Sequence, residues 1–122
     1  MSNPPSLMRG ADLAEGTAKG VAPWPDATRK IILLRRGGRV FAWLDACPHY
    51  RGGTPMAWKR DAYLDAAGDH IVCFSHGALF DPESGDCVAG PCLGKRLRRI
   101  AVEECADGEI RLTQGLGGLR AQ

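Results

Sequence analysis

The sequence predicts a small all-β domain, and two observations carry that prediction. Sixteen Gly and eight Pro are spread along 122 residues and separate short apolar runs, a pattern typical of many turns and short strands. The hydrophobic fraction of 44% and the charged fraction of 25% are those of an ordinary globular protein. We therefore expect residues 1–122 to form a single domain of antiparallel sheets. Its core is modest, so a bound metal group that ties distant loops together would add to its stability.

The first half of the chain contains the clearest strand signals. Residues 1–12 are polar and contain Pro, so we expect a loosely ordered N-terminus. A first strand is predicted at Thr17–Val21. The apolar runs Lys30–Arg35 and Arg39–Leu44 flank Arg36-Gly37-Gly38, and a Gly-containing loop between two such runs predicts a β-hairpin.

The second half is predicted to contain shorter strands and one helical segment. The acidic residues Asp61, Asp65 and Asp69 are spaced four apart, which favours a short helix within Pro55–Ala67. Turn residues elsewhere delimit the remaining elements. These are a strand at His70–Phe74, a strand end at Leu79–Asp81 with a turn at Pro82–Asp86, and strands at Leu97–Glu103 and Glu109–Thr113 joined by Ala106-Asp107-Gly108.

Charge and apolar patterning argue against several classes of partner. The net charge of +2 is too small to indicate nucleic-acid binding. The sequence contains two basic clusters, one of Arg35, Arg36 and Arg39 and the other of Lys95, Arg96, Arg98 and Arg99. We expect both to be solvated strand faces. The alternative is that they form a docking surface for an acidic redox partner. We find neither a secretory signal nor an apolar run that could span a membrane. An odd number of cysteines, five, fits a reducing compartment, so we expect a cytoplasmic protein without membrane partners.

Two Cys-His pairs carry the chemistry. Cys47 and His49 lie two positions apart, Cys73 and His76 lie three apart, and residues 50–72 separate the pairs. Thiolate and imidazole are ligands for borderline and soft metals. Two of each can hold either a tetrahedral zinc ion or a mixed-ligand iron-sulfur cluster, and ligand type alone does not decide between them.

The residues around both pairs resemble the Rieske family. The sequence reads Cys47-Pro-His-Tyr-Arg-Gly-Gly-Thr-Pro and Cys73-Phe-Ser-His-Gly-Ala-Leu-Phe-Asp, and the resemblance extends over residues 31–113. It implies one Rieske-type 2Fe-2S cluster, with each loop giving its Cys to one iron and its His to the other. It also implies a small Rieske-like fold in which residues 45–94 form a cluster-binding subdomain of two loops, with the short helix as an insertion.

Other residues refine this resemblance. Glycines in the ligand loops would let backbone N–H groups approach the cluster sulfurs; they are Gly52, Gly53 and Gly77. The respiratory branch bridges its loops with a disulfide at the positions of Gly52 and Ser75, and it places hydroxyls at the positions of Ala78 and Phe80. With fewer hydrogen bonds to sulfur, this chain is expected to have a reduction potential near the lower end of the Rieske range, about −150 mV.

The resemblance implies an electron carrier. We expect single electrons to pass between a reductase and a terminal oxygenase, as in the soluble ferredoxins, and we find no Ser-His-Asp or paired-carboxylate arrangement that would indicate an enzyme. The alternatives are the small ferredoxin-like subunit of a nitrite reductase, or a zinc-stabilised binding module without a redox role.

The remaining thiols and the third histidine are predicted to lie outside the metal site. The loop Gly90–Gly94 is expected to shield the cluster without ligating it. Cys87, Cys92 and Cys105 are interpreted as small, partly buried thiols, with a redox-active Cys87–Cys92 pair as the alternative. His70 is interpreted as a structural or surface residue.

Overall fold

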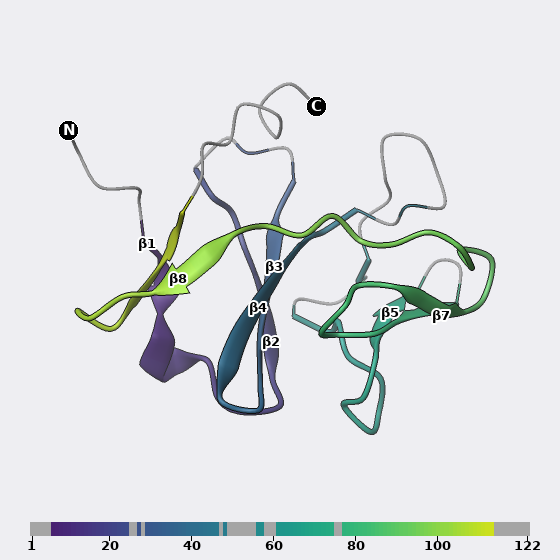
Figure 1. The fold of residues 1–122 in the computed structure, drawn as a ribbon, viewed down its shortest axis with the longest axis horizontal. Helices are drawn as coiled ribbons and strands as arrows, with labels where there is room; N and C mark the ends of the chain where they lie inside the picture. Colours follow the sequence, from purple (N-terminus) through teal and green to yellow (C-terminus); the bar gives the residue numbers. More distant parts are fainter. Residues whose placement is uncertain are drawn as a thin grey trace.

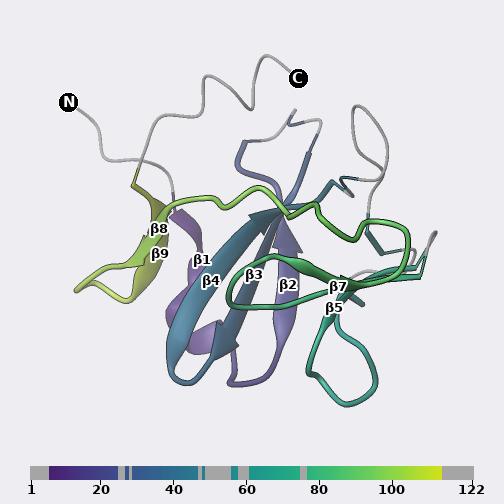
Figure 2. The same cartoon turned by 45° about the vertical axis from the view of Figure 1, so that its right-hand side comes forward.

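The computed structural model describes residues 6–24, 27, 29–46, 48, 56–57, 61–74 and 77–113. Within them the chain forms three three-stranded antiparallel sheets, which confirms the predicted all-β class (Figure 1). The sheets, in spatial order of their strands, are β1 (Ser6–Arg9), β9 (Glu109–Leu112) and β8 (Val102–Glu104); β2 (Ala18–Val21), β3 (Ile31–Arg36) and β4 (Arg39–Leu44); and β5 (Ile71–Cys73), β6 (Ala78–Phe80) and β7 (Cys87–Ala89). The β2–β3–β4 sheet lies between the other two (Figures 1 and 2).

The β3–β4 hairpin is the centre of the fold. Its strands pair without interruption from Ile31 opposite Leu44 to Arg36 opposite Arg39. Gly37 and Gly38 form the two-residue turn with φ of 62° and 77°, the left-handed conformation that such hairpin turns require. The predicted hairpin is confirmed, with Arg36 belonging to the strand and not to the loop.

Alternate residues of this hairpin fill two separate cores. Because side chains on a strand point to opposite faces in turn, Ile32 and Trp43 pack toward the β5–β6–β7 sheet, whereas Ile31 and Leu44 pack toward β9. Ile31, Ile32 and Trp43 are essentially inaccessible to solvent. The continuous apolar runs of β3 and β4 therefore reflect a sheet that is covered on both faces.

The chain returns from the β5–β6–β7 sheet to β8 alongside β4 (Figure 1). Leu44 donates its backbone N–H to the carbonyl of Arg98 at 2.9 Å, and Ile100 donates to Ala42 at 3.0 Å. These bonds extend the central sheet by an irregular segment. The strand expected at Leu97–Glu103 is consequently reduced to β8 at Val102–Glu104, and β7 was not predicted at all.

The predicted helix within Pro55–Ala67 is wrong for the described residues 56–57 and 61–67. Asp61 has a φ of 60°, which is incompatible with a right-handed helix. Leu64 instead forms an antiparallel bridge with Ile71, and Val72 donates to the carbonyl of Tyr63 at 2.8 Å. The segment is extended and pairs with β5, and the only helical turn in the described chain is η1, a 3-10 turn at Gly10–Asp12.

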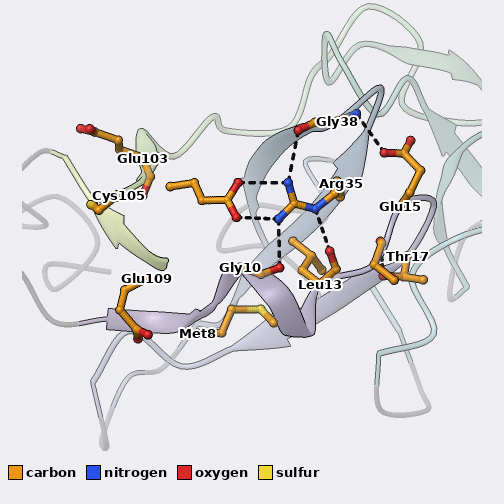
Figure 3. A network of polar contacts seen from close by, with 12 residues as sticks. Met8, Gly10, Leu13, Glu15, Thr17, Arg35, Gly38, Glu103, Cys105 and Glu109 are labelled. Atoms are coloured by element: carbon orange, nitrogen blue, oxygen red, sulfur yellow. Dashed lines mark hydrogen bonds and ion pairs between the residues drawn. The ribbon is translucent and has the colours of Figure 1, made fainter. Parts of the chain in front are cut away.

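The expectation of a loosely ordered N-terminus is corrected for residues 6–12. Ser6–Arg9 form β1, which pairs with β9, and η1 follows directly. The guanidinium of Arg35, on β3, is at the centre of a network that holds this segment in place (Figure 3). It donates to the carbonyls of Leu13 (2.7 Å) and Gly10 (3.0 Å) and forms a bidentate pair with the carboxylate of Glu104 at 3.0 and 2.9 Å.

In the part of the chain that the structure describes, no helix has the length and apolar character needed to cross a membrane.

Candidate metal centre

The first predicted ligand loop begins where β4 ends. Asp45 follows Leu44 directly. It is a charged residue that is nevertheless buried, with 6% of its surface exposed. Cys47 and His49 lie outside the described residues, as do Gly52 and Gly53. Between the two ligands, the carbonyl of Pro48 accepts a hydrogen bond from Lys95 Nζ at 3.3 Å. The first loop is therefore in contact with the segment that follows the Gly90–Gly94 loop.

The second predicted ligand loop is the turn of the β5–β6 hairpin. Cys73 is the last residue of β5, is fully buried and pairs with Ala78 at the start of β6. Gly77 has a φ of 74° and donates its N–H to the carbonyl of Cys73 at 2.7 Å. This bond joins the end of β5 to the residue before β6. Ser75 and His76 come between these two residues in the sequence and lie outside the described residues.

The loop Gly90–Gly94 packs on this turn. A Cβ at Gly90 would lie 2.8 Å from the Cα of Ala78 and 3.2 Å from the carbonyl oxygen of Gly77, so the two backbones are in direct contact. The backbone N–H of Lys95 donates to the carbonyl of Cys92 at 2.9 Å, and this bond closes the loop. The side chain of Cys92 is buried, whereas Leu93 is 65% exposed. The loop predicted to shield the cluster thus lies against the base of the second ligand loop.

A buried hydrogen-bond network, which the sequence did not reveal, joins the two ligand loops. The carboxylate of Asp45 accepts hydrogen bonds from the backbone N–H of Met56 at 2.7 Å and from the hydroxyl of Tyr63 at 3.1 Å. The carbonyl of Met56 in turn accepts from the N–H of Phe74 at 2.9 Å, one residue after Cys73. The one feature of the sequence that could have indicated this network is Asp45, an acidic residue directly after a buried strand.

Burial governs the electrostatics of this network. Desolvation raises the pKa of Asp45 above the ordinary range of a carboxyl, and the hydrogen bonds from Met56 and Tyr63 counteract the rise by stabilising the anion. The pKa of Tyr63 is raised because the phenol is buried and faces the negative charge of Asp45. The raised pKa of Tyr63 keeps the phenol neutral, so its hydroxyl can donate the hydrogen bond to Asp45.

The other cysteines and His70 occupy the places expected of non-ligands. Cys87 is a buried free thiol whose Sγ donates to the carbonyl of Ala89 at 3.2 Å. Cys105 is a partly exposed free thiol beside the carbonyl of Glu103. The ring of His70 lies 3.0 Å from Asp65 at a half-exposed turn, which is a structural contact at the surface.

Several members of the two basic clusters are paired within the molecule. Arg35 is only 15% exposed and is bonded to Glu104, so its expected placement on a solvated face is wrong. Arg36 pairs with Glu83 at 3.2 Å, and Arg96 with Asp86 at 3.0 Å. These pairs leave less uncompensated positive charge for an acidic partner than the sequence suggested.

The described part of the site has the chemistry that a cluster requires. Cys73 is buried at the end of β5, and Gly77, whose Cβ position is open, directly precedes β6. Among the described residues no three His, Cys, Asp or Glu side chains could hold a metal ion together. Three of the four predicted ligands are outside those residues.

A model of the Rieske [2Fe-2S] domain matches residues 4–111 of the sequence, a span that includes both Cys-His pairs. The chain belongs to the Rieske [2Fe-2S] domain family. A Rieske domain carries one 2Fe-2S cluster, in which two His replace two Cys on one of the irons, and this accounts for the equal numbers of Cys and His in the two loops. A comparison with curated proteins finds no match.

Solved structures with this Rieske fold include ferredoxins and oxygenases. The ferredoxin of carbazole 1,9a-dioxygenase from Nocardioides aromaticivorans IC177 is similar with a TM-score of 0.67 and 21% identity, over 93% of this chain and 100% of that chain. The Sphingomonas yanoikuyae B1 ferredoxin gives 0.68 and 22% over the same shares. The terminal oxygenase of carbazole 1,9a-dioxygenase from Novosphingobium sp. KA1 gives 0.69 and 24%, over 91% of this chain and 29% of that chain. At these identities the similarity establishes the fold.

Proposed function

We propose that this Rieske protein carries single electrons from a reductase to a terminal oxygenase, with its cluster held by Cys47, His49, Cys73 and His76. The observation that carries the proposal is the family match across residues 4–111, a span that contains all four of these residues. A 2Fe-2S cluster supplies a one-electron couple within a fixed set of ligands. The protein's part is to hold and shield that group.

The described residues support such a holding role. Cys73 is placed by β5, and the turn that follows it is closed by the bond from Gly77. The Gly90–Gly94 loop is fixed against that turn by backbone contact. Loops anchored in this way change little between two oxidation states, which keeps the cost of reorganisation during electron transfer small.

The similar structures favour a carrier over an enzyme. The chain matches the two ferredoxins over their whole length, whereas it matches the terminal oxygenase over 29% of that chain. The rest of that oxygenase has no counterpart in these 122 residues. Another similar structure is the complex of reduced oxygenase and oxidized ferredoxin in carbazole 1,9a-dioxygenase, and a partner of that class suits this protein.

The alternatives receive less support. A zinc-stabilised module is disfavoured because the family is defined by a 2Fe-2S cluster. A nitrite reductase subunit shares the family, but two of the similar structures are components of carbazole 1,9a-dioxygenase.

A cytoplasmic location is part of the proposal. The free thiols of Cys87 and Cys105 fit a reducing compartment.

Anaerobic redox titration of the purified protein tests the function. The as-purified protein is titrated with dithionite, and reduction by NADH through a flavin-dependent ferredoxin reductase is followed by visible absorbance. We expect uptake of one electron per chain, bleaching of the visible bands and an EPR signal from the reduced cluster. A colourless protein that binds zinc and accepts no electron would refute the proposal.

A further inference from the structure

Asp45 occupies a position from which it can act on both ligand loops. It is two residues before Cys47 in the sequence and directly follows β4. Its carboxylate is buried, and each oxygen accepts one hydrogen bond, from Met56 N–H at 2.7 Å and from Tyr63 Oη at 3.1 Å. Burying a carboxylate costs free energy of folding unless its oxygens are hydrogen-bonded. The two hydrogen bonds to Asp45 are therefore required for its burial and are not incidental contacts.

The residues that donate to Asp45 belong to a segment that is itself fixed to β5. We call the described residues 56–57 and 61–70 the strap. The carbonyl of Met56 accepts from Phe74, and the carbonyl of Tyr63 accepts from Val72 at 2.8 Å. Both acceptors lie on the strap, and both donors lie within one residue of Cys73. A displacement of the strap would therefore displace the second ligand loop.

The strap is also fixed to the central sheet. Asp61 Oδ1 accepts the backbone N–H of Gly20 on β2 at 2.8 Å. Tyr63 packs directly on that glycine, because a Cβ at Gly20 would overlap the tyrosine hydroxyl. The phenol is thereby held with its hydroxyl directed at Asp45, and it has no room to turn away on the β2 side.

We propose that Asp45 is a positioning residue of the metal centre, whose carboxylate couples the first ligand loop to the second through Tyr63 and Met56. This inference rests on the proposed function, because the ligands it positions are those of the proposed cluster. Asp45 contacts the strap at Met56 and Tyr63 and is not one of the four proposed ligands, so its role is to set the separation of the two loops. The segment between the ligand pairs is accordingly a structural coupling element and not a passive insertion.

Two conservative variants and one matched control test the proposal in the full-length protein with its cluster. Tyr63→Phe deletes one donor and keeps the ring, and Asp45→Asn keeps one acceptor oxygen and replaces the other with an amide. Asp69→Asn removes the same charge from an exposed position of the strap and serves as the control. The readouts are the EPR g-values of the dithionite-reduced cluster and the rate of iron release to a ferrous chelator.

A hydrogen bond to a charged group corresponds to roughly a tenfold change in an equilibrium. We therefore expect iron release to be about tenfold faster in Tyr63→Phe and in Asp45→Asn than in Asp69→Asn, together with shifted g-values. The double variant should release iron no more than about twofold faster than Asp45→Asn, because both substitutions break one contact. A purely structural role would lower the melting temperature without moving the g-values.

The outcomes separate this inference from the proposed function. If the wild-type protein contains a cluster while both variants match Asp69→Asn in g-values and iron release, the positioning role is refuted and the function stands. If Asp45→Asn fails to fold, Tyr63→Phe alone decides in the same way. A wild-type protein without iron and sulfide would refute the function and this inference with it.

Discussion

The Arg35 network gives the sharpest prediction about stability. All five N–H groups of the guanidinium are used, on three carbonyl groups and the carboxylate of Glu104. The network joins β3 to the N-terminal segment, to the β3–β4 turn and to β8 (Figure 3). Arg35→Met keeps the apolar stem and removes every donor. The partner groups then remain in place without their bonds.

The magnitude follows from which acceptors are left behind. The carbonyls of Gly10 and Leu13 are bonded at part-buried positions, and each lost bond there costs about 1 kcal/mol. The carbonyl of Gly38 and the carboxylate of Glu104 are more exposed, so water can replace the lost hydrogen bonds. We therefore assign no loss of unfolding free energy to these two groups. The expected loss in unfolding free energy is about 2 kcal/mol. In a domain of this size that corresponds to a melting temperature lower by about 8 °C.

Thermal and urea denaturation of the cluster-loaded protein measure this loss. Arg35→Lys retains one ammonium in place of the fork and should lose about 1 kcal/mol. Arg9→Met is the matched control, because Arg9 is 73% exposed and lies 4.0 Å from its partner Glu109; its effect should be within about 0.5 kcal/mol. The visible spectrum should be unchanged in all three variants. Equal stabilities of Arg35→Met and Arg9→Met would refute the reasoning.

Three further predictions concern the loop contacts, the pH dependence of stability and the reduction potential. Gly90→Ala should cost about 3 kcal/mol by chemical denaturation, because its φ is 96° and its Cβ would strike Ala78. Gly94→Ala, with a similar φ of 89° but open space around it, should cost about 1 kcal/mol; equal costs would contradict the contact. The pKa of Glu15 is lowered from 4.5 by hydrogen bonds from Gly38 and Gly37, so its contribution is present above pH 4.5 and is lost as the pH falls through the lower folded value. Wild type should therefore lose more stability than Glu15→Gln on acidification, and parallel pH profiles would argue against this. Ala78→Ser should raise the midpoint potential in voltammetry from its expected value of about −150 mV by adding a donor near the cluster; an unchanged or lower value would show that position 78 does not govern it.

The central hairpin could be predicted because its signals are local. Strong apolar runs flank two glycines, and the glycines adopt the positive φ that the turn demands. By contrast, β1 and β7 are four and three residues long, and their pairing depends on partners distant in the sequence or on a loop. Short, half-exposed strands of this kind carry little periodicity, so composition alone does not reveal them.

The predicted helix failed for a reason that the structure makes explicit. Asp61, Asp65 and Asp69 have helical spacing, but two of these carboxylates accept backbone N–H groups, one from strand β2 and one within a turn. Asp61 accepts from Gly20, and Asp65 accepts from the N–H groups of Asp69 and His70. Short acidic side chains favour such local bonds over a helix interior. Asp65 therefore stabilises a local turn, whereas Asp61 makes a long-range contact with β2.

The sequence indicates the candidate ligands but not the residues that support the ligand loops. Cys and His pairs are recognisable because metal chemistry restricts residue type and spacing. The Asp45–Tyr63 contact joins residues 18 positions apart in the sequence, and no spacing rule connects them. Its existence depends on how the strap folds back on β2.

Iron, acid-labile sulfide and EPR, measured together on anaerobically purified protein, test the central claim most directly. The account predicts about two irons and two sulfides per chain with a Rieske-type signal on reduction. It also predicts loss of all three in Cys73→Ala and no change in His70→Ala. Wild-type protein free of sulfide, or a Cys73→Ala variant that keeps its full iron and colour, would contradict it.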